Sequence, residues 1–358
     1  DMQADIPRVQ ECLTCFLNHT SKPCRHYTPV FHPDNLDMVM LYCEGPSVPH
    51  TLLYSLIEDD VVFSVQNNSQ LEDLSNEMAW PQIRDFRVQL DNGFVALVRM
   101  SIPPEVVEEK SIIGYTTILH VDGVTGEQTV NYKWGVSLDT YFVTNRSWVV
   151  LQMDVSGSGG QELEEYYQPA WNLGTPEARD YIALVRYLSK TLDLVDADRI
   201  GAWGWGGHQG YNTLRLLKED REGMFKCVTA IGPVTDWASY ASYYTEQYMG
   251  TAKIMRGGNY RGYEKTSLLH DGEAFRNRTL LLVHGSADLD AHYSHTLKFT
   301  KELSTKGVLF KEQTYTDEDS DLINVRDHLL RTLDRFFFEC YPPYTELELE
   351  ELIEKAKG

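Results

Sequence analysis

Hydrophobic and polar positions between residues 25 and 66 fall into short runs with frequent breaks. The runs are rich in β-branched and aromatic residues, and the breaks between them carry Asp, Asn, Pro and Gly. This pattern predicts four consecutive strands, RHYTPVF, DMVMLYC, HTLLYSLI and VVFSVQ. Four strands in about forty residues are the size of one β-propeller blade, and a single blade cannot close a ring. We therefore expect residues 1–75 to be the last blade of a longer propeller.

From residue 76 onward the pattern changes to strands that increasingly alternate with helices. The run Thr279–Val283 is almost continuously apolar, which is typical of a strand buried on both faces. A helix is predicted over Pro176–Thr191, with Thr175 as its N-cap. Residues 76–358 are thus predicted to form an α/β domain with a mostly parallel sheet. Its strands are RDFRVQL, GFVALVRM, TTILHV, WVVLQMDV, RIGAWGW, CVTAIG, TLLLVHG and VLFKEQTY.

Two further helices are predicted near the C-terminal end, over His292–Lys306 and Asp321–Phe338. The second has an apolar stripe formed by Leu322, Val325, Leu329, Leu330, Leu333 and Phe337. Beyond it, Thr345 and Glu348 have capping-box spacing, which predicts a short acidic helix. Its apolar face would contain Leu349, Leu352, Ile353 and Ala356. The alternative is a frayed tail, because isolated helices of this length are marginal in water.

Composition and charge narrow the class of protein. The chain has 358 residues, of which 42% are apolar, enough for two cores. It has no run of 18 apolar residues, so we expect no membrane span within it. Its first residues, DMQADIPRVQ, lack the features of a signal peptide, and we expect the natural protein to extend upstream. The net charge of −21 argues against nucleic acid and anionic lipid as partners.

Cysteines and glycosylation sequons bear on location. Six cysteines occur together with four N-x-[ST] sequons, at Asn18, Asn67, Asn145 and Asn277. The combination favours a secreted or luminal, disulfide-bonded glycoprotein. The alternative is a zinc site made by Cys12, Cys15, Cys24 and Cys43, although no second C-x₂-C follows the first pair.

The segment GAWGWGGHQG, residues 201–210, lies between the predicted strand Arg199–Trp205 and a helix expected to begin near Tyr211. A strand, a sharp turn and a helix form the nucleophile turn of an α/β-hydrolase, written G-x-S-x-G. Here glycine occupies the nucleophile place at Gly206, and His208 takes the place of the last glycine. The context is that of a hydrolase turn, but no hydroxyl or thiol is presented.

These features and several further motifs resemble the dipeptidyl peptidase IV branch of the prolyl oligopeptidase family over nearly the whole chain. The motifs are CLTC, CEGP, WGW, FKC, YTEQYMG, HGSADLDAH, YTDED and FFFECY, in this order. The resemblance implies an α/β-hydrolase fold preceded by the last blade of a propeller. It also implies the disulfides Cys12–Cys15, Cys24–Cys43 and Cys227–Cys340.

Carried over to this chain, the family's active site is incomplete. Its serine falls at Gly206, or within Gly206–Gln209 because the local alignment needs an insertion. Its histidine falls at Ser320 and its oxyanion tyrosine at Asp122, whereas its aspartate is retained as Asp288. Glycine carries no nucleophile, serine at 320 takes no proton near neutral pH, and a carboxylate at 122 opposes an oxyanion. We therefore expect no peptidase activity.

Other residues in these loops have alternative interpretations. Replacement nucleophiles could come from Ser156, Ser158, Thr213 and Ser286, but small residues in glycine-rich loops more often serve turn geometry. His208 is either a displaced base or a residue that fills space. The spacing of Asp288, Asp290, His292 and His295 suits a metal but also suits a loop before a helix. By the resemblance, Trp237, Tyr240 and Tyr244 line a specificity pocket. Otherwise they are core.

Two hypotheses for function follow. The first is a catalytically inactive glycoprotein that acts through protein binding, as inactive members of the family do beside voltage-gated potassium channels. The second is a serine exopeptidase that releases X-Pro dipeptides. The resemblance further implies no cofactor, a homodimer, and a type II membrane protein or secreted protein whose anchor would lie upstream.

Overall fold

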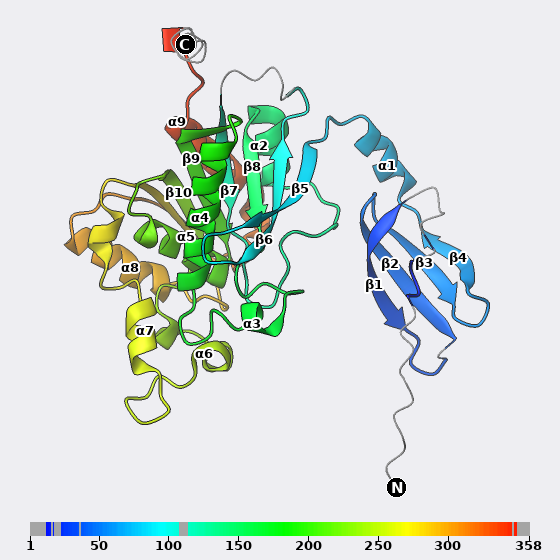
Figure 1. Ribbon diagram of the computed structural model, residues 1–358, viewed down its shortest axis with the longest axis horizontal. Coiled ribbons are helices and arrows are strands. Elements are labelled where there is room, and N and C mark those ends of the chain that lie inside the picture. Colours follow the sequence, from blue (N-terminus) through cyan, green and yellow to red (C-terminus); the bar gives the residue numbers. More distant parts are fainter. Residues whose placement is uncertain are drawn as a thin grey trace. The chain divides into compact units, whose positions relative to one another are not determined.

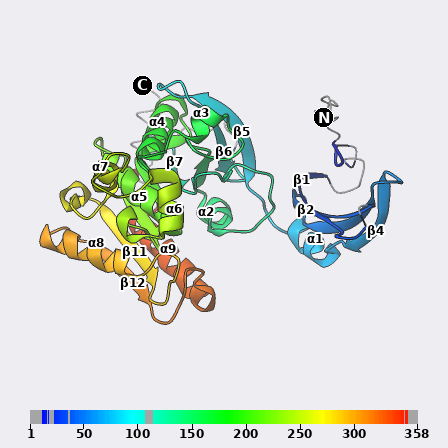
Figure 2. The same ribbon diagram turned by 90° about the horizontal axis from the view of Figure 1, so that it is seen from below.

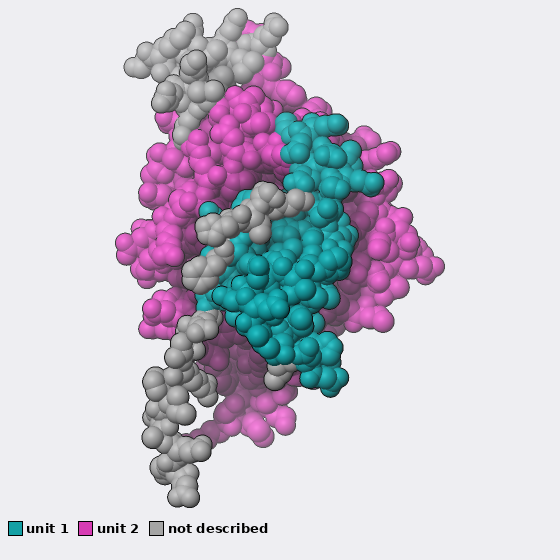
Figure 3. Space-filling model, turned by 90° about the vertical axis from the view of Figure 1, so that its right-hand side faces the viewer, with its two compact units in different colours: residues 1–79, 131–136 teal, residues 80–130, 137–358 magenta. Residues whose placement is uncertain are grey.

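The computed structural model describes residues 12–15, 17, 23–35, 37–106, 114–345 and 347–348 (Figure 1). The chain forms two compact units, coloured separately in Figure 3. Unit 1 comprises residues 1–79 and 131–136, and unit 2 comprises residues 80–130 and 137–358. The segment 131–136 belongs to unit 1, although the sequence groups it with the second domain. One reason is that the backbone N–H of Trp134 donates to the carbonyl of Glu44 at 2.7 Å.

Unit 1 contains a four-stranded antiparallel sheet whose strands lie in chain order. The strands are β1 (Cys24–Phe31), β2 (Met38–Pro46), β3 (His50–Ser55) and β4 (Asp60–Gln66), followed by helix α1 (Ser69–Asn76). Alternate residues of β2 point inward, so that Val39 and Leu41 meet Leu52 and Tyr54 of β3 in a small core. The prediction of a four-stranded blade is confirmed.

Unit 2 is built on an eight-stranded sheet with the order β12-β11-β10-β9-β7-β8-β6-β5. The six strands from β12 to β8 are parallel to their neighbours, and β6 and β5 continue the sheet antiparallel. The strands are β5 (Gln82–Gln89), β6 (Val95–Ile102), β7 (Tyr115–His120), β8 (Val149–Met153), β9 (Val195–Trp205), β10 (Phe225–Ile231), β11 (Thr279–Gly285) and β12 (Lys311–Tyr315). The predicted α/β-hydrolase class is therefore confirmed.

Helices cover both faces of this sheet (Figures 1 and 2). Helices α4 and α5 pack on one face in the larger apolar core, and α2 and α9 pack on the other face in a second core. The helices of unit 2 are α2 (Leu138–Arg146), α3 (Leu163–Tyr166), α4 (Thr175–Thr191), α5 (Gly207–Glu219), α6 (Ser242–Met249), α7 (Tyr260–Thr266), α8 (Ser294–Thr305) and α9 (Arg326–Cys340). This three-layer packing explains why β11 is apolar almost throughout.

Several helix boundaries differ from prediction. The N-cap of α4 is Gly174, with φ +80°, so the assignment of Thr175 as N-cap is wrong. A Cβ at Gly174 would lie 2.3 Å from the Tyr211 ring, so the close contact between this backbone position and the ring requires glycine. The predicted start of the last helix at residue 321 is also wrong. Leu322 has φ +48°, a 3₁₀ turn follows, and α9 begins at Arg326.

The apolar stripe of α9 mostly faces the sheet. Leu329, Leu333 and Phe337 are fully buried in the second core, whereas Leu330 is 39% exposed. After α9 the capping box forms as predicted. The backbone N–H of Thr345 donates to Glu348 Oε2 at 2.8 Å, and the N–H of Glu348 donates to Thr345 Oγ1 at 3.4 Å. The helix predicted beyond it, with Leu349, Leu352, Ile353 and Ala356, lies outside the described residues.

All six cysteines are paired, as Cys12–Cys15, Cys24–Cys43 and Cys227–Cys340. These are the pairs that the resemblance implies, and they leave no thiolates for the alternative zinc site. The sequon residues Asn67, Asn145 and Asn277 are exposed, while Asn18 lies outside the described residues. Among the described residues, no helix combines the length and apolar character needed to cross a bilayer.

Candidate functional site

The turn between β9 and α5 presents Gly206. This residue has φ +118° and ψ 167°, a region that is essentially restricted to glycine. Its N–H donates to the carbonyl of Ile231 at 2.9 Å, and its carbonyl accepts from the N–H of Gly210 at 2.7 Å. Helix α5 begins directly afterwards, at Gly207, rather than near Tyr211 as predicted. Gly206 therefore lies between strand and helix, where an α/β-hydrolase carries its nucleophile.

The side chain of Gln209 fills the space beside Gly206. A Cβ added at Gly206 would lie 2.4 Å from Gln209 Oε1. The amide of Gln209 also donates to Asp122 Oδ1 at 3.4 Å. The structure thus brings positions 206 and 122 together, as expected, but through a glutamine whose role the sequence did not reveal.

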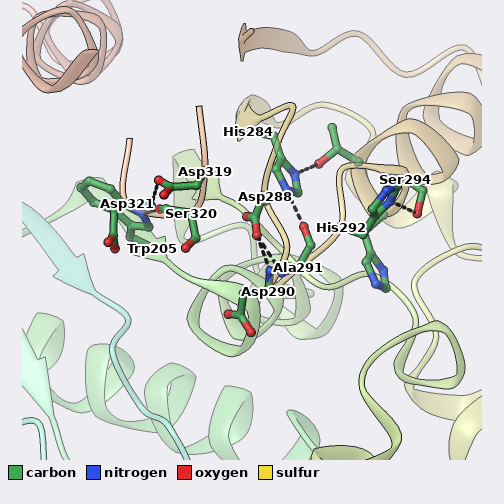
Figure 4. A network of polar contacts seen from close by, with 12 residues as sticks. Trp205, His284, Asp288, Asp290, Ala291, His292, Ser294, Asp319, Ser320 and Asp321 are labelled. Atoms are coloured by element: carbon green, nitrogen blue, oxygen red, sulfur yellow. Dashed lines mark hydrogen bonds and ion pairs between the residues drawn. The ribbon is translucent and has the colours of Figure 1, made fainter. Parts of the chain in front are cut away.

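Asp288 follows β11 and is held by local hydrogen bonds (Figure 4). Its Oδ1 accepts the backbone N–H groups of Asp290 and Ala291 at 2.8 and 2.9 Å, and its Oδ2 lies 3.3 Å from His284 Nε2. Both nitrogens of His284 have partners of their own, Thr296 Oγ1 and the carbonyl of Ala291, each at 2.7 Å. His284 is therefore fully engaged and buried, and it is not available as a base.

Ser320 lies on the loop after β12, between Asp319 and Asp321 (Figure 4). Its carbonyl accepts the indole N–H of Trp205 at 2.9 Å, which ties this loop to the end of β9. The loop is thus anchored next to the turn by its backbone. The residue that it offers there is a hydroxyl rather than an imidazole, so it supplies no general base.

The residues suggested as metal ligands do not converge. No group of three or more His, Cys, Asp or Glu side chains within the described ranges has the geometry of a metal site. His292 is on the surface and contacts Ser294 Oγ at 2.9 Å. His295 accepts the backbone N–H of Thr235 at 3.2 Å, and burial lowers its pKa to about 4. The hydrogen bonds of these two histidines stabilise the loop and the helix that contain them.

The alternative nucleophiles serve structure. Ser156 Oγ donates to Asp180 Oδ2 at 2.5 Å, and both residues are buried. Thr213 Oγ1 donates to the carbonyl of Gln209 at 2.8 Å within α5. Ser286 Oγ accepts the N–H of Asp317 at 2.9 Å, and Ser158 is 1% exposed. None of these hydroxyls is hydrogen-bonded to a histidine, as an activated nucleophile would be.

Trp237, Tyr240 and Tyr244 form one aromatic cluster. Ring centroids lie 5.6 Å apart for Trp237 and Tyr240, 6.0 Å for Trp237 and Tyr244, and 5.7 Å for the two tyrosines. His208 of α5 packs into this cluster, and its Nδ1 lies 2.5 Å from the hydroxyl of Tyr244. Tyr240 instead donates its hydroxyl to Asp290 Oδ1 at 2.9 Å.

His120 and Asp139 form a pair that sequence reasoning missed. His120 Nδ1 lies 2.5 Å from Asp139 Oδ2, and the imidazole stacks on the Trp203 indole with centroids 4.2 Å apart. Burial lowers the pKa of His120, but Asp139 outweighs it and the net pKa is raised. The available signal was a histidine at the end of an apolar parallel strand, where functional side chains collect.

Comparison with known proteins assigns the family. The profile of the prolyl oligopeptidase family matches residues 134–342. Venom dipeptidyl peptidase 4 of Apis mellifera is 32% identical over 333 residues, 92% of this chain and 41% of the relative. Inactive dipeptidyl peptidase 10 of Rattus norvegicus is 29% identical over 332 residues, 92% of this chain and 40% of the relative. The chain thus spans about two fifths of the length of these curated relatives.

A solved structure agrees with the sequence comparison. Porphyromonas gingivalis dipeptidyl peptidase 4 superposes with a TM-score of 0.81 at 25% identity, covering 87% of this chain and 43% of that chain. The relatives include both peptidases and proteins named inactive, so the comparison leaves the activity open. The family match, the α/β-hydrolase sheet and the four-stranded blade lead to one assignment. The chain belongs to the prolyl oligopeptidase family and is a dipeptidyl peptidase 4-like member of it.

Proposed function

We propose that this protein is a catalytically inactive dipeptidyl peptidase-like glycoprotein that acts by binding another protein. One observation carries the proposal. The turn between β9 and α5 presents Gly206, and the side chain of Gln209 occupies the adjacent space. Acyl transfer by a serine peptidase requires a nucleophilic oxygen at this position. Gly206 offers none.

The surrounding residues support the same proposal. Ser320 stands at the position of the general base, and the nearby His284 already has partners on both nitrogens. Asp122 places a carboxylate where an oxyanion would form, which opposes the charge that develops in the transition state. Asp288 could orient a base, but it has none to orient. Each of the three losses would by itself suppress turnover.

We place this function on the extracellular side. The three disulfides fit an oxidising compartment, and Asn67, Asn145 and Asn277 are exposed acceptors for N-glycosylation. We further propose a homodimer that is either secreted or anchored as a type II membrane protein by an upstream segment. Its partner would be a membrane protein such as an ion channel, for which it serves as an accessory subunit. A native pull-down from the source tissue identifies the partner.

The competing function is a serine exopeptidase that releases X-Pro dipeptides. It is favoured by the retained Asp288 and by the strand, turn and helix that surround Gly206. Fluorophosphonate labelling and hydrolysis of Gly-Pro-p-nitroanilide distinguish the two functions, with porcine dipeptidyl peptidase 4 as the positive control. We expect neither labelling nor turnover. Steady hydrolysis by protein free of other peptidases, together with labelling of one serine, would establish the exopeptidase instead.

A further inference from the structure

His208 is enclosed by aromatic rings although it lies in the second position of a helix. It is 6% exposed, and its ring meets Trp237 and Tyr244 edge to face, with centroids 5.3 and 5.9 Å apart. Tyr211 packs on the indole of Trp237 with centroids 4.8 Å apart. An imidazole is a polar group, and enclosing it among rings is costly unless its nitrogens have partners.

The two nitrogens of His208 face different partners. Burial raises the pKa of Tyr244, so its hydroxyl stays neutral, and its oxygen lies 2.5 Å from His208 Nδ1, close enough to accept a hydrogen bond from a protonated ring. Nε2 then lies 3.6 Å from Glu177 Oε1, a contact that is an ion pair when the imidazole is protonated. Glu177 is 1% exposed, and neither of its carboxylate oxygens has a hydrogen-bond partner. A buried carboxylate in this state calls for a positive charge beside it.

Gly207 and Gly210 allow the start of α5 to approach β10 closely, and this position of the helix places His208 among the aromatic rings. A Cβ at Gly210 would lie 2.9 Å from the Cα of Pro233, and a Cβ at Gly207 would lie 3.2 Å from Val234 Cγ2. Larger residues would hold the start of α5 away from the end of β10. The imidazole is therefore placed by the close approach of the backbone and not by a flexible loop.

We infer that Glu177, Trp237 and Tyr244 form a site for a small heteroaromatic cation, and that the chain's own His208 is its occupant. The Glu177 carboxylate supplies the negative charge, the indole and phenol rings form the walls, and the Tyr244 hydroxyl oxygen accepts one hydrogen bond from the cation. While His208 stays in place, no external ring enters. His208 is thus an internal plug that prevents an external ring from binding in this aromatic cluster. The inference does not depend on whether the protein hydrolyses peptides.

Removal of the plug tests the inference through binding alone. His208→Gly leaves a space of imidazole shape next to Glu177, and imidazole titrated by calorimetry near pH 6 is the probe. We expect imidazole to bind His208→Gly about tenfold or more tightly than it binds the wild type, and to raise the Tm of the variant. His292→Gly, which removes an exposed imidazole, is the matched control and should gain no binding. Adding Glu177→Gln to His208→Gly should weaken imidazole binding about tenfold.

Two results would overturn the inference. The first is a folded His208→Gly variant that binds imidazole no better than the wild type does. The second is binding that is unaffected by Glu177→Gln, since the carboxylate would then have no part. If His208→Gly does not fold, diethyl pyrocarbonate modification of the wild type, mapped by mass spectrometry, decides the matter. His208 must then react far more slowly than His292, and equal rates would contradict an enclosed plug.

Discussion

Gly206→Ser places a hydroxyl at the end of β9, but the structure predicts a cost in stability and no gain in activity. The backbone at Gly206 has φ +118° and ψ 167°, and holding any other residue there costs about 1–3 kcal/mol. The new Cβ would also lie 2.4 Å from Gln209 Oε1. Rotation of the flexible Gln209 side chain relieves this contact but gives up its 3.4 Å hydrogen bond to Asp122, which is too long to add much.

Activity should stay at background because the new serine has no base. Ser320 accepts no proton near neutral pH, and triad members act as a unit, so a serine alone recovers little of the roughly 10⁶-fold that a whole triad supplies. The triple variant Gly206→Ser, Ser320→His and Asp122→Tyr is the meaningful comparison. It should exceed the single variant, provided that the strained turn points the hydroxyl toward position 320.

Two assays on the same preparations check this prediction. Urea unfolding gives the loss of stability, and Gly-Pro-p-nitroanilide hydrolysis with fluorophosphonate labelling gives the activity. Gly257→Ser is the matched control, since its φ is +88° and nothing lies within 4 Å of an added Cβ. It measures the cost of a side chain at a positive φ where no neighbouring atom is contacted. Substantial turnover by Gly206→Ser alone would show that another residue acts as base, and unchanged stability would contradict the strain argument.

Three further predictions concern stability and assembly. Replacing Cys227 and Cys340 together by alanine should lower the free energy of unfolding by about 4–5 kcal/mol, because the bond closes a loop with a sequence separation of 113; an unchanged urea midpoint would contradict this. Between pH 6.5 and about 4, His295 binds a proton in the unfolded chain but not in the folded protein. The free energy of unfolding should therefore fall by about 3 kcal/mol as the pH drops through this window, and His295→Gln should reduce that pH dependence. Sedimentation of the intact protein at micromolar concentration should show a dimer that is weakened by Leu330→Glu, whereas a purely monomeric boundary would count against the homodimer.

The sequence predicts the strands and the sheet class well because both follow from local periodicity. β11 is apolar from Leu280 to Val283, where helices cover both faces of the sheet, and burial alternates along β2 because only one of its faces is covered. Positions fixed by tertiary contact were not predictable in this way. Gly174 replaces Thr175 as the N-cap of α4 because the Tyr211 ring crosses at that point. Leu322 is buried in a left-handed turn, which delays the start of α9.

In the candidate site, too, some features follow from the local sequence and others depend on tertiary contacts. Gly206, Asp288 and Ser320 could be located from motif letters. The first two follow β9 and β11, whose ends are marked by buried apolar residues, whereas Ser320 follows the polar strand β12 and rests on its motif alone. The contacts of Gln209 and His208 could not, because they depend on where α5 begins. It begins directly after Gly206, which places Gln209 beside Gly206 and His208 in the aromatic cluster.

The glycines of this turn are explained by packing without any chemistry. A Cβ at Gly204 would lie 2.3 Å from Thr213 Oγ1 and 2.8 Å from the carbonyl of Val121, and a Cβ at Gly210 would press on Pro233. These contacts hold α5 against β9 and β10 whether or not a nucleophile stands between them. A hydrolase turn can therefore lose its serine and keep its shape, since the residues that set the shape are not those that react. A glycine-rich turn is accordingly a sign of the fold, and only the residue that it presents bears on catalysis.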